Sequence, residues 1–255
     1  MFCTPEQVPS EIERLLDLVD EMLKTFGYPY TIELSTRPTE KALGSVETWK
    51  KAEDLLASVM KQRGQEFTID EGGGAFYGPK LDFKLIDAIG RKWQGPTVQL
   101  DFNLPERFEI EYTGADNAAH RPVMLHRVLV GSMERFVGGL IEHYAGAFPV
   151  WLAPEQVRVI PIATDFTEAA KSVVDRLKAA GARVHLDDRS ETLNYRIREA
   201  ETLKIPYMAI VGKREAESDS IALRIRGEGK KQEVMTVPDF AAMVKDRIDM
   251  RALSL

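Results

Sequence analysis

The sequence predicts an α+β protein in two parts: an antiparallel sheet with helices packed against it over residues 1–150, then an α/β domain around a mixed sheet over residues 151–255. Three observations predict this fold. The 255 residues are enough for two domains. Helical and strand periodicities alternate along the chain. The segment Phe148-Pro-Val-Trp-Leu-Ala-Pro154 contains two prolines and is the best candidate for a domain boundary.

The first part opens with a helix. Thr4, Pro5 and Gln7 supply a cap residue, a first-turn proline and a capping-box glutamine. Apolar residues then recur at helical spacing as far as residue 26, and Gly27 ends the helix. The next expected elements are a strand at Tyr30–Ser35, a helix at about Val46–Arg63, a short strand at Glu66–Asp70, two strands between Leu81 and Leu104 joined at Ile89-Gly90, and a strand at Phe108–Thr113.

The run from His126 to Glu142 predicts a helix with two different faces. One face carries an apolar stripe for the core: Met133, Phe136, Val137, Leu140, Ile141 and Tyr144. The opposite face carries Gly131, Arg135, Gly138 and Gly139. Glycine inside a helix costs about 1 kcal/mol relative to alanine, so this face is expected to admit something planar or anionic beside Arg135. Equally, the glycines could let another element pack tightly, with Arg135 in an ion pair.

The second part alternates strands and helices, which is typical of an α/β domain. Its expected elements are strands at Val157–Ile162, Arg183–Asp187, Met208–Val211, Ser220–Ile225 and Glu233–Thr236, with helices at Thr167–Ala180, at Leu193–Leu203 and from about Asp239.

Composition narrows the class of protein. Hydrophobic residues make up 44% and charged residues 29%, which is ordinary for a soluble globular protein. No apolar run approaches the roughly 20 residues that span a bilayer, and no signal segment opens the chain, so we expect a cytoplasmic location. The single cysteine, Cys3, excludes an internal disulfide and a self-contained Cys-x-x-Cys zinc site.

The net charge of −6 is unevenly distributed. Residues 1–154 carry 16 Lys and Arg against 23 Asp and Glu, whereas residues 155–255 carry 18 against 17. An acidic total argues against indiscriminate nucleic-acid binding but allows a local RNA-binding face on the second part.

Five segments, taken in order, resemble bacterial threonyl-tRNA synthetases, which are class II aminoacyl-tRNA synthetases. They are Leu34-Ser-Thr-Arg-Pro38, Glu71-Gly-Gly-Gly-Ala-Phe-Tyr-Gly-Pro-Lys80, Thr97-Val-Gln-Leu-Asp-Phe102, Pro122-Val-Met-Leu-His-Arg127 with Gly131-Ser-Met-Glu-Arg-Phe136, and Phe148-Pro-Val-Trp-Leu-Ala-Pro154. The resemblance implies an antiparallel class II core, incomplete here, followed by an anticodon-binding domain with a mixed sheet. It also implies the family's activity: ATP with Mg²⁺ activates threonine, which is then transferred to tRNA-Thr.

The resemblance assigns roles to named residues. Arg135 matches the motif 3 arginine that binds ATP, a role suited to its planar fork. Tyr77 is expected to approach the substrate amine and Lys80 a phosphate. Secondary candidates for the same pocket, which would bind the nucleotide and substrate, are Gln94, Thr97, Gln99 and Ser132. Without the resemblance, Gly72–Gly74 reads as a flexible turn, and Thr97 and Gln99 as ordinary alternating strand residues.

His126 has two interpretations. A lone histidine beside an apolar run is usually a packed or surface residue. By the resemblance it matches one of three protein ligands to a Zn²⁺ ion that binds the amino and hydroxyl groups of threonine, which valine cannot reproduce. We expect His126 and Arg135 to face one shared cavity.

In the second part, Glu215 and Arg224 match positions that read anticodon bases in the family. Arg226 lies two residues further, on the same strand face, and Arg189, Asn194 and Arg198 are further candidates for RNA contact. A charged strand face is more often simply solvated, so both interpretations stay open.

The chain also departs from the family pattern. Motif 1, most of motif 2 and the other two zinc ligands have no counterpart, and Gly95-Pro96 stands where the family commonly has Cys-Gly. We therefore expect the C-terminal portion of a synthetase that is inactive in adenylation by itself, with an unpaired sheet edge and exposed apolar surface, and a homodimer for the complete enzyme. The alternative is a non-catalytic RNA-binding protein that uses the anticodon-binding domain.

Overall fold

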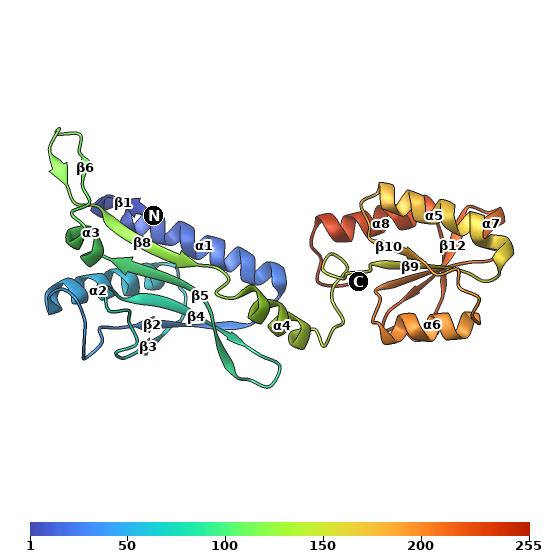
Figure 1. The fold of residues 1–255 in the computed structure, drawn as a ribbon, viewed down its shortest axis with the longest axis horizontal. Helices are drawn as coiled ribbons and strands as arrows, with labels where there is room; N and C mark the ends of the chain where they lie inside the picture. Colours follow the sequence, from blue (N-terminus) through green and yellow to red (C-terminus); the bar gives the residue numbers. More distant parts are fainter. The chain divides into compact units, whose positions relative to one another are not determined.

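The computed structural model describes residues 1–255 and divides them into two compact units, Met1–His143 and Tyr144–Leu255 (Figure 1). The sequence analysis placed this division after residue 150. No helix in either unit is long and apolar enough to cross a membrane.

The first unit is built on a six-stranded sheet with the strand order β1-β8-β5-β4-β2-β3. Neighbouring strands are antiparallel, except for the parallel pair β2 and β3. The strands are β1 (Phe2–Cys3), β2 (Tyr30–Ser35), β3 (Thr68–Asp70), β4 (Lys80–Ile86), β5 (Lys92–Asp101) and β8 (Val123–Val128). The predicted antiparallel core is therefore confirmed.

Two long helices, α1 (Val8–Phe26) and α2 (Val46–Gln62), contact this sheet and each other (Figure 1). Helix α1 ends where Gly27 adopts the left-handed conformation at φ 63°, which glycine reaches without steric cost. Helix α2 begins at Ser45, whose hydroxyl accepts a hydrogen bond from the backbone of Thr48 at 3.1 Å. Each helix buries an apolar stripe, as the periodicity predicts.

The two faces of the sheet differ because side chains alternate along a strand. On β4, Leu81, Phe83 and Leu85 are buried on the apolar face, which forms the core. Lys80, Asp82 and Lys84 point to the other face. This second face is polar although parts of it are buried, and it carries most of the candidate site residues.

The predicted helix from His126 to Glu142 is wrong in its first part. Residues 123–128 form β8, which pairs with β5, and helix α4 begins only at Met133 and runs to His143. Pairing with β5 supplies hydrogen bonds that local periodicity cannot reveal, and it overrides the helical pattern.

The apolar stripe predicted for this helix is only partly buried. Phe136 and Leu140 are buried, and Phe136 packs edge-on against Phe26 at 5.0 Å between ring centroids. Three members of the predicted stripe are instead exposed: Met133 (63%), Val137 (44%) and Ile141 (50%). The helix therefore carries a wider apolar surface than this chain covers, which agrees with the apolar exposure expected from the sequence.

The region after β5 also differs from expectation. β5 ends at Asp101, and residues 103–107 form a short helix, α3, that was not predicted. The predicted strand Phe108–Thr113 is reduced to β6 (Tyr112–Thr113). β6 pairs with β7 (Ala119–His120) as a separate two-stranded ribbon. The carboxylate of Asp101 accepts hydrogen bonds from the backbone N–H groups of Asn103 and Leu104, which fixes the start of α3.

The second unit has a five-stranded mixed sheet, as predicted, and its strand order is β10-β9-β11-β12-β13. Strands β10, β9 and β11 are parallel, and β12 and β13 are antiparallel additions. The elements are β9 (Val157–Pro161), α5 (Thr167–Ala179), β10 (Val184–Leu186), α6 (Leu193–Thr202), β11 (Tyr207–Val211), α7 (Lys213–Glu217), β12 (Ser220–Ile225), β13 (Glu233–Thr236) and α8 (Val237–Asp249).

Helices cover both faces of this second sheet (Figure 1). The larger core cluster joins α5 and α8 to one face, where Val157 and Val159 are fully buried. The smaller cluster joins α6 to the other face through Ile160 and Met208. The short helix α7 was not predicted from the sequence.

Candidate functional site

A row of polar residues crosses five strands of the first sheet. Strand pairing places Asp70, Ser35, Lys80, Gln99 and His126 side by side, in that order. Directly paired residues point to the same face of a sheet, with their Cβ atoms about 5 Å apart. Three predicted site residues, from β4, β5 and β8, therefore lie in one line on the polar face.

The glycine-rich segment brings Tyr77 over this row. The phenol of Tyr77 donates a hydrogen bond to the side-chain oxygen of Gln99, and its ring lies 4.9 Å from the ring of His126. Burial, and to a smaller extent the charge of Asp101, raises the pKa of Tyr77 above its ordinary value. The phenol therefore stays protonated at neutral pH and acts as a donor.

Two close contacts hold the segment in place. The side-chain amide of Asn103 donates to the backbone carbonyl of Tyr77 at 2.7 Å. A Cβ atom at Gly78 would lie only 1.8 Å from the carbonyl oxygen of Leu100, so only glycine fits at this position. The segment is thus fixed against β5 and is more than a flexible turn.

The ammonium group of Lys80 is bound to Asp82, with Nζ 2.6 Å from Oδ2. Asp82 is fully buried. Burial opposes its ionisation, but the hydrogen bond and charge of Lys80 outweigh this and lower the pKa of Asp82. The carboxyl group is therefore charged at neutral pH. Lys80 is the basic residue that, by the resemblance, is expected to approach a phosphate.

The secondary candidates Gln94 and Thr97 lie on the same polar face. The amide of Gln94 donates to the second oxygen of Asp82 at 2.9 Å, and its carbonyl accepts from Lys84 at 2.7 Å. Thr97 is buried and pairs directly with Asp82 across the two strands. Both belong to the cluster around Asp82.

His126 is held by a buried carboxylate. Its Nε2 atom lies 2.8 Å from Oδ2 of Asp101, which is fully buried. No group of three His, Cys, Asp or Glu side chains in this chain could hold a metal ion. One imidazole paired with a carboxylate that is already hydrogen-bonded does not make a zinc site, so the residues present do not hold the ion by themselves. Zinc bound with ligands from elsewhere stays a prediction.

Arg135 and Ser132 lie at the start of α4. The guanidinium of Arg135 is exposed and forms no hydrogen bond or ion pair within the chain. The hydroxyl of Ser132 is engaged locally: it accepts from the backbone of Arg135 at 3.3 Å and donates to Glu134 at 2.9 Å. No contact joins Arg135 to the row that ends at His126, so their shared cavity stays a prediction.

The glycines beside Arg135 differ in the space around them. A Cβ atom would meet nothing within 4 Å at Gly131 or Gly138, whereas at Gly139 it would lie 2.5 Å from the hydroxyl of Tyr28. Tight packing therefore explains Gly139 only. Arg135 forms no ion pair, so the second interpretation does not account for it. A planar or anionic group beside Arg135 stays a prediction.

Sequence reasoning missed three residues that organise the site: Asp82, Asp101 and Asn103. The first two were recognisable in principle. Asp82 lies two residues from Lys80, and Asp101 two residues from Gln99, so strand alternation places each on the same face as a candidate. Asn103 carried no such signal, because its role depends on the tertiary position of Tyr77.

In the second unit, the structure does not join Glu215 and Arg224. Glu215 lies in α7, where its carboxylate accepts from the backbone of Gly212 at 2.9 Å. Arg224 lies on β12 and is buried, and its guanidinium donates to the carbonyl of Gly229 at 3.0 Å and to Glu201 at 3.2 Å. Each side chain is therefore already engaged within the domain.

Arg226 has a structural role in this unit. Its guanidinium donates to the backbone carbonyls of Ala147 and Phe148 at 2.9 and 2.8 Å, and to that of Lys204. It thereby ties residues 147–148 to the end of β12. These backbone contacts account for the presence of Arg226 without any contact to RNA.

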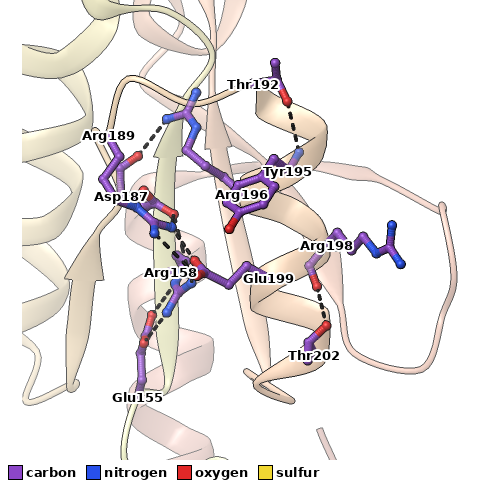
Figure 2. A network of polar contacts seen from close by, with 10 residues as sticks. All are labelled: Glu155, Arg158, Asp187, Arg189, Thr192, Tyr195, Arg196, Arg198, Glu199 and Thr202. Carbon is purple, nitrogen blue, oxygen red and sulfur yellow. Dashed lines mark hydrogen bonds and ion pairs between the residues drawn. The ribbon is translucent and has the colours of Figure 1, made fainter.

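The other arginines considered for RNA contact have different environments (Figure 2). Arg189 donates through two nitrogens to the buried Asp187, at 2.8 and 2.7 Å, and also to Glu199. Its charge is therefore neutralised inside the network. Arg198 points away from the network, is exposed, and its guanidinium has no acidic partner. Asn194 is also exposed, on the same helix, α6.

Comparison with known families agrees with this division of the chain. Residues 1–144 match the family described as the tRNA synthetase class II core domain (G, H, P, S and T). Residues 156–247 match the family described as the anticodon binding domain. Together the two matches cover most of both units.

Two individual relatives of the chain are both threonine–tRNA ligases. The chain is 55% identical over 229 residues to a threonine–tRNA ligase from Caldanaerobacter subterraneus, covering 90% of this chain and 35% of that protein. It is 49% identical over 253 residues to one from Desulforamulus reducens, covering 99% of this chain and 40% of that protein. The chain thus spans between 35% and 40% of the length of these two relatives.

A solved structure gives the same result. The RNA binding domain of threonyl-tRNA synthetase from Cryptosporidium parvum Iowa II superimposes with a TM-score of 0.89 at 38% identity, covering 96% of this chain and 62% of that one. The chain therefore belongs to the threonyl-tRNA synthetase family of class II aminoacyl-tRNA synthetases.

Proposed function

We propose that this chain forms the threonine-activating and tRNA-binding part of a threonine–tRNA ligase. The observation that carries the proposal is the line formed by Lys80, Gln99 and His126 on one sheet face, with Tyr77 held over it. Tyr77 and Lys80 lie close together in the sequence, and the sheet brings them beside Gln99 and His126 from two other strands. The segment that follows β8 carries the unpaired Arg135.

The arrangement suits the chemistry of adenylate formation, which needs held phosphate charge and an oriented attacking oxygen. Arg135 offers a free guanidinium at the start of α4 for the phosphates or the base of ATP, whose Mg²⁺ would arrive with the nucleotide. Tyr77, held over the row, and Gln99 within it form a polar pair that is suited to bind the amine and hydroxyl of threonine. His126 would add one ligand to a Zn²⁺ ion completed by other residues.

The second unit would bind tRNA-Thr through its anticodon. The match to the anticodon binding domain supports this role. The exposed, unpaired Arg198 offers phosphate affinity, whereas Glu215 and Arg224 would have to exchange their present partners for RNA bases. A homodimer and a cytoplasmic location are also part of the proposal, by analogy with the family.

A chimera tests the proposal directly. In the Desulforamulus reducens ligase, the 253 matched residues are replaced by this chain, and threonine-dependent ATP–pyrophosphate exchange and tRNA charging are measured. We expect the chimera to exchange and charge, and this chain alone to do neither, because it spans 40% of that protein. A folded chimera that charges no tRNA with threonine contradicts the proposal.

The alternative of a non-catalytic RNA-binding protein receives no support from the site. Tyr77, Lys80, His126 and Arg135 all match the family pattern, and the proximity of the first three supports a catalytic role. A chimera that binds tRNA but never forms threonyl-adenylate would favour this alternative.

A further inference from the structure

One buried carboxylate stands at the centre of the polar sheet face. Asp82 lies in the middle of β4, between β2 and β5, and none of its surface is exposed. A charged side chain in such a place is costly unless it is paired and hydrogen-bonded. An apolar residue of similar size would serve packing better, so the carboxylate needs another explanation.

Both oxygens of Asp82 are used. Oδ2 lies 2.6 Å from the ammonium of Lys80 and 3.2 Å from the hydroxyl of Ser35, and Oδ1 accepts from the amide of Gln94 at 2.9 Å. The ammonium of Lys84 is further away, at 3.6 Å. Two candidate site residues from different strands are therefore oriented by the same carboxylate.

We propose that Asp82 is a positioning residue that fixes the ammonium of Lys80 and the amide of Gln94 on the floor of the active site. This inference rests on the proposed function for its role in the reaction, but the placement itself can be tested without catalysis. Asp82 touches no substrate in this account and acts only through the two side chains that it holds.

The pairing has a specific consequence for Lys80. Its side chain is 20% exposed, so a phosphate could reach the ammonium without displacing the backbone. Asp82 holds the flexible lysine stem in one place before the phosphate arrives, which reduces the ordering cost of binding. An asparagine in the same position has no charge and only one acceptor oxygen, so it could not hold both the ammonium of Lys80 and the amide of Gln94.

Asp70 supplies a matched control. It lies on the neighbouring strand β3, and its Oδ2 atom is 3.0 Å from the same Ser35 hydroxyl, but it contacts neither Lys80 nor Gln94. Lys84 supplies a matched lysine, because its side chain is 19% exposed and it has a second acidic neighbour, Glu33, at 3.6 Å.

Competitive labelling of amines tests the placement in the unchanged full chain and in the variants Asp82→Asn and Asp70→Asn. Trace acetic anhydride is applied near pH 8, and mass spectrometry gives the rate at each lysine. We expect Asp82→Asn to raise the rate at Lys80 several-fold, because the amine is no longer held in a charge-assisted hydrogen bond to a buried carboxylate and is free to meet the reagent. Lys84 should change much less, and Asp70→Asn should change neither.

A rate at Lys80 that is unchanged in Asp82→Asn would overturn the proposal. If that variant does not fold, the unchanged chain decides: Lys80 must label several-fold more slowly than Lys84, and equal rates contradict the placement. The role in the reaction is tested in the chimera, where Asp82→Asn should raise the KM for ATP and spare tRNA binding. An inactive chimera with a labelling change at Lys80 would reject the proposed function while leaving the placement supported.

Discussion

The carboxylate of Asp101 lies 2.8 Å from Nε2 of His126 and also accepts hydrogen bonds, at 2.9 Å each, from the backbone N–H groups of Asn103 and Leu104. One buried side chain thus orients the histidine and fixes the start of α3. Because Asn103 in turn holds the carbonyl of Tyr77, the histidine, the short helix and the tyrosine segment form one connected unit.

Removal of this carboxylate should therefore destabilise the first unit. We expect Asp101→Ala to lower the free energy of unfolding by about 1–3 kcal/mol, because it leaves one buried and one partly buried N–H group without an acceptor. Urea denaturation followed by circular dichroism measures this. The exposed pair of Asp116 and His120, also 2.9 Å apart, is the matched control, and Asp116→Ala should have no measurable effect. Equal losses in the two variants would contradict the role of Asp101.

Arg135 should matter for activity and not for stability. Its exposed guanidinium has no partner in the chain, so Arg135→Ala should leave the unfolding midpoint unchanged. In the chimera it should reduce ATP–pyrophosphate exchange by about a hundredfold or more, as expected when one charge-stabilising donor is lost from a transition state. Arg127, a second exposed arginine on the preceding strand, is the control. Normal exchange by the Arg135→Ala chimera would remove this residue from the site.

Gly78 should tolerate no side chain. Because a Cβ atom there would lie 1.8 Å from the carbonyl oxygen of Leu100, Gly78→Ala must displace the Tyr77 segment from β5. We expect loss of the Tyr77–Gln99 hydrogen bond and a lower free energy of unfolding. In NMR spectra, the phenol signals of Tyr77 should move to the positions of a tyrosine without this hydrogen bond. Gly138→Ala is the opposite case: the space around it is open, and the change should stabilise α4 by about 1 kcal/mol. A stable Gly78→Ala protein with Tyr77 unmoved would refute the close fit.

Some elements of this fold can be predicted from the sequence, and others cannot. Strand alternation and apolar stripes predict elements such as Tyr30–Ser35 and Ser220–Ile225 to the residue, because those segments carry their pattern locally. The run from His126 to Val128 carries no such pattern, and only its pairing with β5 decides that it is a strand. The resemblance named Tyr77, Lys80 and His126. Strand alternation places Asp82 on the same face as Lys80, but the contact of Asp101 with His126 becomes visible only when β5 and β8 are placed in register.

The buried network of the second unit should depend on Asp187. This fully buried carboxylate binds Arg189 through two hydrogen bonds and lies 3.9 Å from the buried Arg158 (Figure 2). Removal of one partner from a buried ion pair is strongly destabilising, so Asp187→Asn should cost about 3 kcal/mol. Asp188, the exposed neighbour, is the control, and Asp188→Asn should be neutral.

The same residue predicts a pH dependence. The hydrogen bond and charge of Arg189 lower the pKa of Asp187 relative to the unfolded chain, against the opposing effect of burial. A group with a lowered pKa stabilises the fold above its unfolded value, near pH 4, and loses that contribution as the pH falls further. Stability of the unchanged chain should therefore fall between about pH 4 and pH 2 more steeply than that of Asp187→Asn. Parallel curves for the two proteins would contradict this origin.

Measurements of RNA binding by the second unit should distinguish the roles of Arg189 and Arg198, which the sequence offers equally as candidates for RNA contact. Arg198 is exposed without an acidic partner, whereas Arg189 forms ion pairs with Asp187 and Glu199. A phosphate contact releases counterions, so Arg198→Ala should weaken tRNA binding and reduce the slope of log K against log salt by about 1. Arg189→Ala should leave that slope unchanged and lower the unfolding midpoint instead. Filter binding at several salt concentrations measures the slope for each variant. A slope that is reduced in Arg189→Ala and unchanged in Arg198→Ala would show instead that the ion-pair network opens when RNA binds.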